Sequence, residues 1–426
     1  MAYYPVLNTK KIKDAPIRLI DGDRSAKYPK RSEFVPEGVA FLNAESIKDG
    51  RINLDAVNFI SEEKYSAISK GRIQTDDVVM TTRGNGTGDV AFVGKTISRG
   101  LINAQMLILR ANETELDAAF LYYFLRSPLF AASMKSFRSG SAQPQLPMFA
   151  LKEMEIRYPA LLRQRRIASI LSAYDDLIEN NTRRIKILEQ MAQTLYREWF
   201  VNFRFPGHQK VKMVESELGP IPEGWEVAHV VDFGSVVTGK TPSKARPDFF
   251  GADVPFIKLP DMHGNVFVLD TSEHLSVLGQ ASQANKTIPA NTLCVSCIGT
   301  AGIVVITTCP SQTNQQINSV VLDYPPYREF LYFRLLDLRE TINQYGANGA
   351  TMVNLNKTKF ENLRLVRSPQ DIVTCFHALA APMFEHVRNL QQRTVTLSKT
   401  RDFLLPKLIS GEIPVETAAE LVEQTA

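Results

Sequence analysis

The most regular hydrophobic pattern in the chain covers residues 162–200. Apolar side chains recur there at alternating intervals of three and four residues, and neither proline nor glycine interrupts them. This spacing predicts one long α-helix with an apolar seam that packs against another helix. At a rise of about 1.5 Å per residue, such a helix would be roughly 50 to 60 Å long. The predicted seam positions are Ile178, Asn181, Ile185, Leu188 and Leu195.

A second seam with the same spacing follows 209 residues later, so that Leu188 corresponds to Leu397. Its predicted positions are Val387, Leu390, Leu397 and Leu404. Pro382 and Pro406 lie within this helix, and we expect it to be kinked or shorter because each proline removes a helical hydrogen bond. The matching seams predict an antiparallel helix pair in which the Asn181 amide fixes the register. The alternative is that each helix packs only on its own domain.

Shorter apolar runs that are typical of β-strands precede each long helix. Two of them lie at 77–82 and 105–110, and a short amphipathic helix is expected at 120–126. All three patterns recur about 210 residues later, at 292–297, 318–323 and 330–338. Pro159 and Pro369 mark the boundary before each long helix. Each half of the chain therefore has the same plan, with a mixed region followed by a long helix.

The sequence itself also repeats. The segment Val39–Ile52 returns 215 residues later as Val254–Phe267, and the order of all repeated segments is kept. Such a duplication predicts pseudo-twofold symmetry, as in a homodimer fused into one chain. We therefore expect an α+β fold with two pseudo-repeated mixed α/β domains, joined by two long helices that form an antiparallel coiled coil. The expected segments are a first domain (1–158), the first long helix (159–202), a linker (203–224), a second domain (225–368), the second long helix (369–413) and a tail (414–426).

Composition sets only broad limits on function. The chain has 426 residues, 44% of them apolar, and a net charge of +4, which allows an anionic partner without requiring one. No apolar run approaches the roughly 20 residues needed to span a bilayer, and the start is unlike a signal peptide, so we expect a cytoplasmic protein. Cys294 and Cys297 have a metal-like spacing, but residues three apart on a strand face opposite sides. We expect reduced core thiols and no metal site.

Two motifs suggest catalysis, and neither has the context that catalysis requires. Gly234–Thr241 matches the phosphate-loop pattern, in which a loop must lead directly into a helix. Pro242 and Pro247 follow here, so ATP hydrolysis at Lys240 is the less favoured alternative. Asp323–Tyr327 is similar to a methyltransferase tetrapeptide, but Tyr324 stands where an Asp or Asn is needed, which predicts a turn. No nucleophile–base set is present, so we expect a chain without catalytic residues.

Polar loops recur at equivalent places in the two halves, while their side chains differ. Arg, Lys, Asn and Gln carry donors and acceptors that read base edges, and hydroxyl groups hold phosphates. We therefore predict that both sets of loops contact double-stranded DNA, each reading a different sequence. Ordinary surface loops, or a scaffold that binds only proteins, are the alternatives. The candidate residues are Arg24, Lys27, Tyr28, Lys30, Arg31, Arg83, Asn85, Thr87, Gln105, Ser141 and Gln143 in the first half, and Lys240, Thr241, Ser243, Lys244, Arg246, Thr300, Gln316, Asn348 and Thr351 in the second.

Four strings, taken with the repeat, resemble the specificity subunit of Type I restriction–modification enzymes. They are Leu19–Arg24, Leu195–Phe200, Pro222–Glu226 and Leu404–Ile413. The resemblance covers nearly the whole chain, although the first half lacks the Gly-Trp-Glu string that opens the second.

The resemblance implies a subunit that recognises DNA and has no active site of its own. Each domain would be a target recognition domain that reads one half of a bipartite, asymmetric site, and the helix pair would set the spacer between the halves. Two modification (methyltransferase) subunits would dock on the helices, and restriction (motor-nuclease) subunits would join them. S-adenosylmethionine and ATP with Mg²⁺ would be used by those partners, with no cofactor in this chain and no contact with a membrane.

Overall fold

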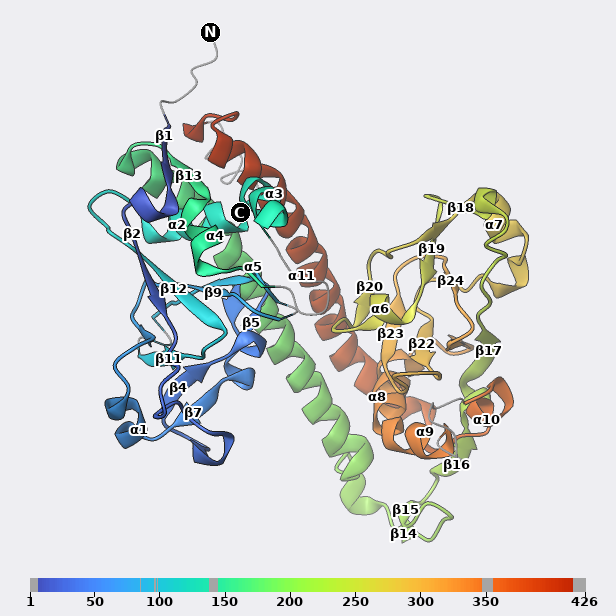
Figure 1. Cartoon of the computed structure of the whole chain (residues 1–426). Helices are drawn as coiled ribbons and strands as arrows, with labels where there is room; N and C mark the ends of the chain where they lie inside the picture. Colours follow the sequence, from blue (N-terminus) through green and yellow to red (C-terminus); the bar gives the residue numbers. More distant parts are fainter. Residues whose placement is uncertain are drawn as a thin grey trace. The chain divides into compact units, whose positions relative to one another are not determined.

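The computed structural model describes residues 7–84, 86–95, 97, 99–137, 145–346 and 355–416. The chain divides into two compact units, of which the first comprises Met1–Ile178 and Thr396–Ala426 and the second Glu179–Val395. Two long helices, α5 (Leu161–Tyr196) and α11 (Gln370–Ser410), each contribute one part to each unit (Figure 1).

The first unit contains a four-stranded sheet of order β10-β9-β12-β2 and a five-stranded sheet of order β3-β7-β4-β11-β8, and β1 pairs with β13 and β5 with β6. Its strands are β1 (Asn8–Lys11), β2 (Ile17–Asp21), β3 (Phe34–Val35), β4 (Val39–Leu42), β5 (Ile47–Lys48), β6 (Arg51–Ile52), β7 (Asn58–Ile60), β8 (Arg72–Ile73), β9 (Val78–Thr81), β10 (Val90–Phe92), β11 (Gly100–Ile102), β12 (Met106–Ala111) and β13 (Glu155–Tyr158). Its shorter helices are α1 (Glu62–Ala67), α2 (Ala118–Arg126), α3 (Pro128–Phe137) and α4 (Met148–Glu153).

The second unit repeats this plan with the sheet orders β17-β25-β22-β23-β20 and β18-β21-β19-β24, the pair β16-β26, and a β14-β15 hairpin before them. Its strands are β14 (Met213–Val214), β15 (Ile221–Pro222), β16 (Glu226–His229), β17 (Gly234–Thr238), β18 (Phe250–Gly251), β19 (Val254–Ile257), β20 (Phe267–Val268), β21 (His274–Leu275), β22 (Leu293–Ser296), β23 (Val304–Thr307), β24 (Gln312–Thr313), β25 (Ile317–Leu322) and β26 (Arg364–Arg367). Its shorter helices are α6 (Leu259–Met262), α7 (Val277–Ala281), α8 (Tyr327–Asp337), α9 (Arg339–Gly346) and α10 (Lys357–Glu361).

The repeat extends to the register of individual strands. Thr81 pairs with Met106 in the first unit, and Ser296 pairs with Ile317 at the equivalent place in the second. The parallel pair β4–β11 likewise has its counterpart in β19–β24. Strand β1 corresponds to β16, so the first unit has an opening strand although it lacks the Gly-Trp-Glu string. The predicted duplication of a mixed α/β unit is confirmed.

Strands β9 and β12 are mostly apolar because both faces of their sheet are covered. Val78 and Met80 pack in the cluster that contains α2, whereas Val79 packs in a second cluster on the other face. The same holds in the second unit, where Cys294 and Cys297 belong to different clusters. The expectation that these thiols face opposite sides of a strand is confirmed. Burial raises the pKa of both to about 12.

The two long helices are antiparallel within each unit. In the first unit, Leu171 and Tyr174 of α5 share a core with Leu404 of α11. In the second unit, Ala192 of α5 shares a core with Val387 of α11. Each unit thus joins one end of α5 to the opposite end of α11.

The predicted seam positions differ in their exposure. Asn181, Val387, Leu390, Leu397 and Leu404 are buried, and the remaining ones are partly buried: Ile178, Ile185, Leu188 and Leu195.

The second long helix is expected to be kinked or shorter, and the expectation is wrong as to its length. Helix α11 has 41 residues and α5 has 36. Pro382 lies on the exposed side of α11, where water can reach the carbonyl that loses its partner, while the neighbouring Phe384 and Val387 anchor the helix in the core. No described helix is both long and apolar enough to cross a membrane.

Candidate nucleic-acid interface

The predicted polar loops of the first unit meet at one edge of the four-stranded sheet. Strands β2 and β9 end at this edge, and β12 begins there, because β12 is antiparallel to both. The loop after β2, the loop after β9 and the turn before β12 are therefore neighbours. The amide of Thr82 donates to the carbonyl of Gln105 (2.7 Å), and Arg24 Nη2 donates to the carbonyl of Ala104 (3.3 Å).

The second unit brings the equivalent loops together in the same way. Strands β17 and β22 end where β25 begins. The amide of Cys297 donates to the carbonyl of Gln316 (2.7 Å), and Thr241 Oγ1 donates to Gln315 Oε1 (2.7 Å). The contacts match those of the first unit position by position, so the site is present twice.

In each copy a glycine and an asparagine hold the first loop close to the turn that precedes β12 or β25. A Cβ atom on Gly22 would lie 2.2 Å from the carbonyl oxygen of Asn103, and a Cβ atom on Gly239 would lie 2.2 Å from that of Asn314. Only glycine allows this approach of two backbones. Each asparagine Oδ1 also accepts the amide two residues on, from Gln105 (2.9 Å) and from Gln316 (3.1 Å).

Most of the candidate DNA-contacting side chains in the described part of these loops are accessible. Those that are exposed are Arg24, Lys27, Lys30, Arg31, Arg83 and Gln105 in the first unit, and Lys240, Ser243, Lys244, Arg246 and Thr300 in the second. Thr241 and Gln316 are half-buried. The first unit thus presents more cations at this edge than the second.

Three of the candidate DNA-contacting residues form contacts within the protein. Thr87 is buried and its hydroxyl donates to the carbonyl of Gly84 (2.6 Å), so the expectation that it faces a ligand is wrong. The ring of Tyr28 packs edge-on against Phe41 with centroids 5.6 Å apart, and burial raises the pKa of Tyr28. Arg246 forms a bidentate ion pair with Asp248, in which Nε donates to Oδ1 (2.9 Å) and Nη2 to Oδ2 (2.7 Å).

Five candidates lie outside the described residues: Asn85, Ser141, Gln143, Asn348 and Thr351. The segments that follow two of these stretches do return to the site. Leu146 donates its amide to the carbonyl of Thr82 (2.9 Å), and Leu355 donates to that of Cys297 (3.0 Å).

Sequence reasoning missed Gln315, which is exposed at this edge. The repeat aligned Asn103 and Gln105 with Asn314 and Gln316, so the position between them was available as a signal. Its counterpart, Ala104, has no polar side chain, so this position does not stand out as one of the recurring polar positions.

The two segments that match catalytic motifs, Gly234–Thr241 and Asp323–Tyr327, do not adopt the structures that catalysis requires. Gly234–Thr238 is strand β17, paired with β25, and therefore cannot form a phosphate loop. Asp323–Pro326 forms the turn before α8, as predicted. Among the described residues, no group of three or more His, Cys, Asp or Glu side chains could hold a metal ion.

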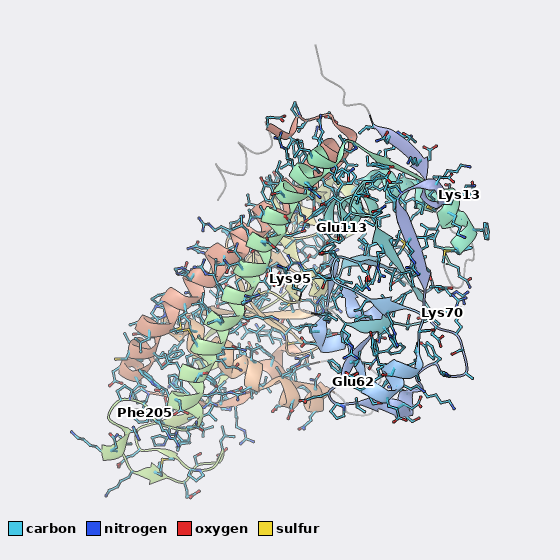
Figure 2. All side chains as sticks on the ribbon, turned by 90° about the vertical axis from the view of Figure 1, so that its left-hand side faces the viewer. Lys13, Glu62, Lys70, Lys95, Glu113 and Phe205 are labelled. Carbon is cyan, nitrogen blue, oxygen red and sulfur yellow. The ribbon has the colours of Figure 1, made fainter. Side chains whose placement is uncertain are left out.

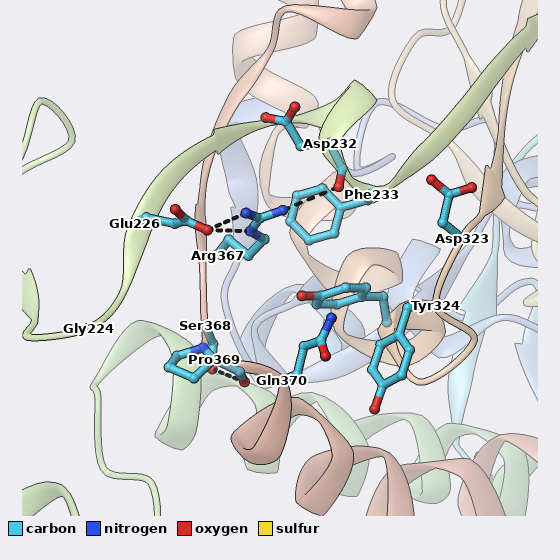
Figure 3. A pocket seen from close by; sticks show the side chains of 11 residues that line it. Gly224, Glu226, Asp232, Phe233, Asp323, Tyr324, Arg367, Ser368, Pro369 and Gln370 are labelled. Carbon is cyan, nitrogen blue, oxygen red and sulfur yellow. Dashed lines mark hydrogen bonds and ion pairs between the residues drawn. The ribbon is translucent and has the colours of Figure 1, made fainter.

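A polar hollow at the start of α11 lies apart from the loops, at the opposite edge of the second unit's sheet (Figure 3). Its charged groups are largely paired with one another. Arg367 Nε donates to Glu226 Oε1 (2.7 Å) and Arg367 Nη1 to the carbonyl of Asp232 (3.3 Å). The hollow is therefore stabilised internally and presents little free charge to a ligand.

A lysine at the far end of the first unit's sheet can serve as a control for the cations of the loops. Lys95 follows β10, whose Phe92 pairs with Val78 at the far end of the sheet. Its side chain is exposed and is labelled in Figure 2. Lys95 is thus a cation of the same unit that does not belong to the candidate interface.

Comparisons with known proteins agree with this duplicated site. The family model described as Type I restriction modification DNA specificity domain matches residues 20–190 and 222–366. The HindI specificity subunit of a Type I restriction enzyme from Haemophilus influenzae is 29% identical over 456 residues, which cover 92% of this chain and 98% of that protein. The MjaIX specificity subunit from Methanocaldococcus jannaschii is 31% identical over 301 residues, which cover 70% of this chain and 69% of that protein.

A solved structure has the same fold. The S subunit of a Type I restriction–modification system from M. genitalium superposes with a TM-score of 0.62 at 15% identity, over 95% of this chain and 96% of that one. The family model matches the chain twice, once in each repeat, and covers well over half of it. The chain belongs to the family of Type I restriction–modification DNA specificity subunits.

Proposed function

We propose that the chain selects the DNA sequence on which a Type I restriction–modification complex acts, and that each unit reads one half of a bipartite, asymmetric site. The observation that carries this proposal is the duplication of the three-loop edge. Two copies share the backbone contacts that hold the loops, yet expose different side chains. Both units would therefore face DNA in the same way, while each would select different bases.

The division of labour within the interface follows from charge. Lys27, Lys30 and Arg31 are exposed cations that follow β2, and Lys240 and Lys244 are exposed cations on the equivalent loop of the second unit. Such side chains neutralise phosphates and fix the position of the protein on the duplex. The turns before β12 and β25 carry neutral amides, which suit contacts with base edges.

The long helices are proposed to set the spacer between the half-sites and to dock two modification (methyltransferase) subunits. The chemistry is assigned to partners: methyl transfer from S-adenosylmethionine to the modification subunits, and ATP- and Mg²⁺-dependent cleavage to restriction subunits. This chain would contribute recognition and no catalytic residue.

Salt dependence of DNA binding tests the phosphate contacts. The full chain, co-produced with its modification subunit, would be titrated with specific duplex over a range of salt concentrations. Each lost phosphate contact lowers the slope of log K against log [salt] by about 1. Lys27→Ala/Lys30→Ala should therefore lower the slope by about 2, whereas Lys95→Ala should leave it unchanged. Equal slopes for all three proteins would exclude this edge as the DNA interface, and no DNA binding at all would favour a protein scaffold.

A further inference from the structure

The two units supply a long polar side chain to the same place from different loops. In the first unit the loop after β2 provides Arg24, whose guanidinium reaches the backbone of Ala104. In the second unit the equivalent loop residue is Thr241, and the equivalent of Ala104 is Gln315. The same two positions are in contact in both units. The long side chain lies on the first loop in the first unit (Arg24) and on the turn in the second unit (Gln315).

Both long side chains are exposed and are held from one side only. Arg24 Nη2 donates to Asp21 Oδ1 and to the Ala104 carbonyl, each at 3.3 Å. A parallel donor pair consists of Nη2 with Nε or Nη1, so a paired contact with a base would exchange one of these two long hydrogen bonds for a base acceptor. Gln315 Oε1 accepts from Thr241 at 2.7 Å, which leaves the amide NH₂ group and a second oxygen lone pair. Each side chain is therefore oriented before any ligand binds.

We propose that Arg24 and Gln315 are the equivalent base-reading residues of the two units, with Arg24 reading a guanine and Gln315 an adenine in the major groove. Asp21 and Thr241 act as positioning residues for them. This inference rests on the proposed function and assigns the kind of base that each unit selects.

The chemistry of each group supports its base. A guanidinium presents two parallel donors that match the N7 and O6 acceptors of guanine, and a carboxamide presents one donor and one acceptor that match N7 and N6 of adenine. Gln315 is neutral and gains little at a phosphate, where cations dominate. Ala104 has no side-chain donor or acceptor, and the hydroxyl of Thr241 donates to Gln315. The position next to Arg24 and the position next to Gln315 therefore add no second base-reading side chain.

The test is selection of duplexes from a random library by the full chain with its modification subunit, followed by sequencing. The wild-type protein should yield a split motif, which tests the proposed function separately. Arg24→Lys keeps the positive charge but loses the paired donors. It should reduce the preference for one G·C pair in one half-site by about tenfold to a hundredfold, with every other position unchanged. Gln315→Ala should do the same to one A·T pair in the other half-site.

Two further variants sharpen the assignment. Gln315→Arg should change the preferred base at that position from adenine to guanine. Thr241→Val keeps the shape of the threonine but removes its hydroxyl, so it should weaken the preference at the same base pair as Gln315→Ala, and Lys95→Ala should leave the motif intact.

The outcomes separate the two proposals. A wild-type protein that selects no motif contradicts the proposed function itself. A normal wild-type motif that survives Arg24→Lys and Gln315→Ala unchanged would overturn the base-reading assignment alone. A uniform loss of affinity without any change in sequence preference would also overturn it, because it would show contacts with phosphates.

Discussion

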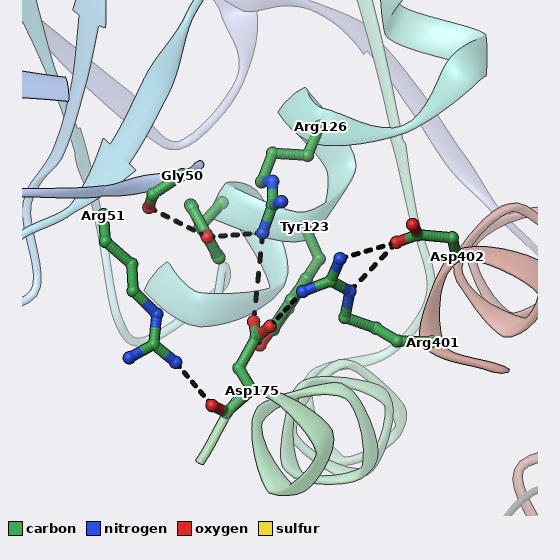
Figure 4. Close-up of polar contacts among 8 residues, drawn as sticks. Gly50, Arg51, Tyr123, Arg126, Asp175, Arg401 and Asp402 are labelled. Carbon is green, nitrogen blue, oxygen red and sulfur yellow. Dashed lines mark hydrogen bonds and ion pairs between the residues drawn. The ribbon is translucent and has the colours of Figure 1, made fainter. Parts of the chain in front are cut away.

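Asp175 of α5 and Arg401 of α11 form an ion pair in the first unit, with 2.5 Å between Oδ1 and Nη1 (Figure 4). The two residues are 226 positions apart in the chain. The other carboxylate oxygen of Asp175 accepts the hydroxyl of Tyr123 (2.7 Å), and its backbone carbonyl accepts Arg51 Nη2 (2.5 Å). One carboxylate thus links both long helices to the mixed domain.

This polar cluster is not repeated. At the offset of 209 residues, Asp175 corresponds to Phe384 and Arg401 corresponds to Ala192, and both lie in the apolar core of the second unit. Both units thus join α5 and α11 through an apolar core, and only the first adds a buried ion pair at these positions. Because a buried polar pair tolerates few alternative partners, this difference favours one arrangement of α5 and α11.

Removing the charge of Arg401 should destabilise the first unit. Arg401→Met keeps much of the side-chain volume but leaves the buried Asp175 without its main cation, at an expected cost of about 3 kcal/mol in the free energy of unfolding. Asp402→Asn removes an exposed partner of the same arginine and should cost less than about 1 kcal/mol. Denaturant unfolding of the full chain measures both. Equal effects of the two variants would contradict a special role for the Asp175 pair.

Truncation of Phe384 tests the apolar counterpart in the second unit. This ring packs edge-on against Tyr332 and Phe333, so Phe384→Ala should cost about 3–5 kcal/mol through the cavity it leaves. Leu379→Ala on the same helix removes a half-exposed side chain and should cost less than about 1 kcal/mol. Thermal unfolding compares the two variants, and a small effect of Phe384→Ala would show that this aromatic packing does not stabilise the unit.

The close approach at Gly22 and Gly239 should tolerate no side chain. A methyl group at either position would meet a backbone carbonyl oxygen that cannot move without shifting the turn before β12 or β25. Gly22→Ala and Gly239→Ala should each destabilise their own unit by about 1–3 kcal/mol and weaken specific DNA binding. Gly94→Ala, where the added methyl group meets open space, is the matched control. If all three variants bind DNA like the wild type, these glycines do not shape the interface.

Thiol reactivity should follow burial. A thiolate is the reactive form, and burial raises the pKa of Cys294 and Cys297 to about 12, so both are protonated at pH 8. Iodoacetamide should modify the exposed Cys375 in the native protein and reach Cys294 and Cys297 only after unfolding. Peptide mass spectrometry distinguishes the sites. Labelling of Cys294 in the native protein at the rate of Cys375 would show that this strand is accessible.

The spacing of neighbouring residues predicts the helices and strands, and comparison of the two halves of the sequence predicts the repeat. The seam of α5, the strands around Val79 and the turn before α8 all follow from spacing and composition. The length of α11 does not, because the prolines lower helix propensity locally while core packing of Phe384 and Val387 restores the helix.

The details of the site depend on the folded path of its loops and on the register of its strands. The loops could be recognised as equivalent, yet their composition does not show that Thr87 turns inward to Gly84 or that Arg246 pairs with Asp248. The repeat marks the position of Gln315 only weakly because its counterpart is Ala104, and the contact with Thr241 shows that Gln315 belongs to the site. Residue chemistry thus predicts the kind of interface, whereas the register of the sheet decides which side chains it contains.

Genome-wide adenine methylation tests the central claim most directly. Cells that contain the modification subunit would be compared with and without this gene. The account predicts a split motif, with two specified halves around a fixed gap, that disappears when the gene is deleted and returns when it is restored. If every methylated motif persists in the deletion strain, and restoring the gene adds none, the assignment of this chain as the subunit that selects the DNA sequence is contradicted.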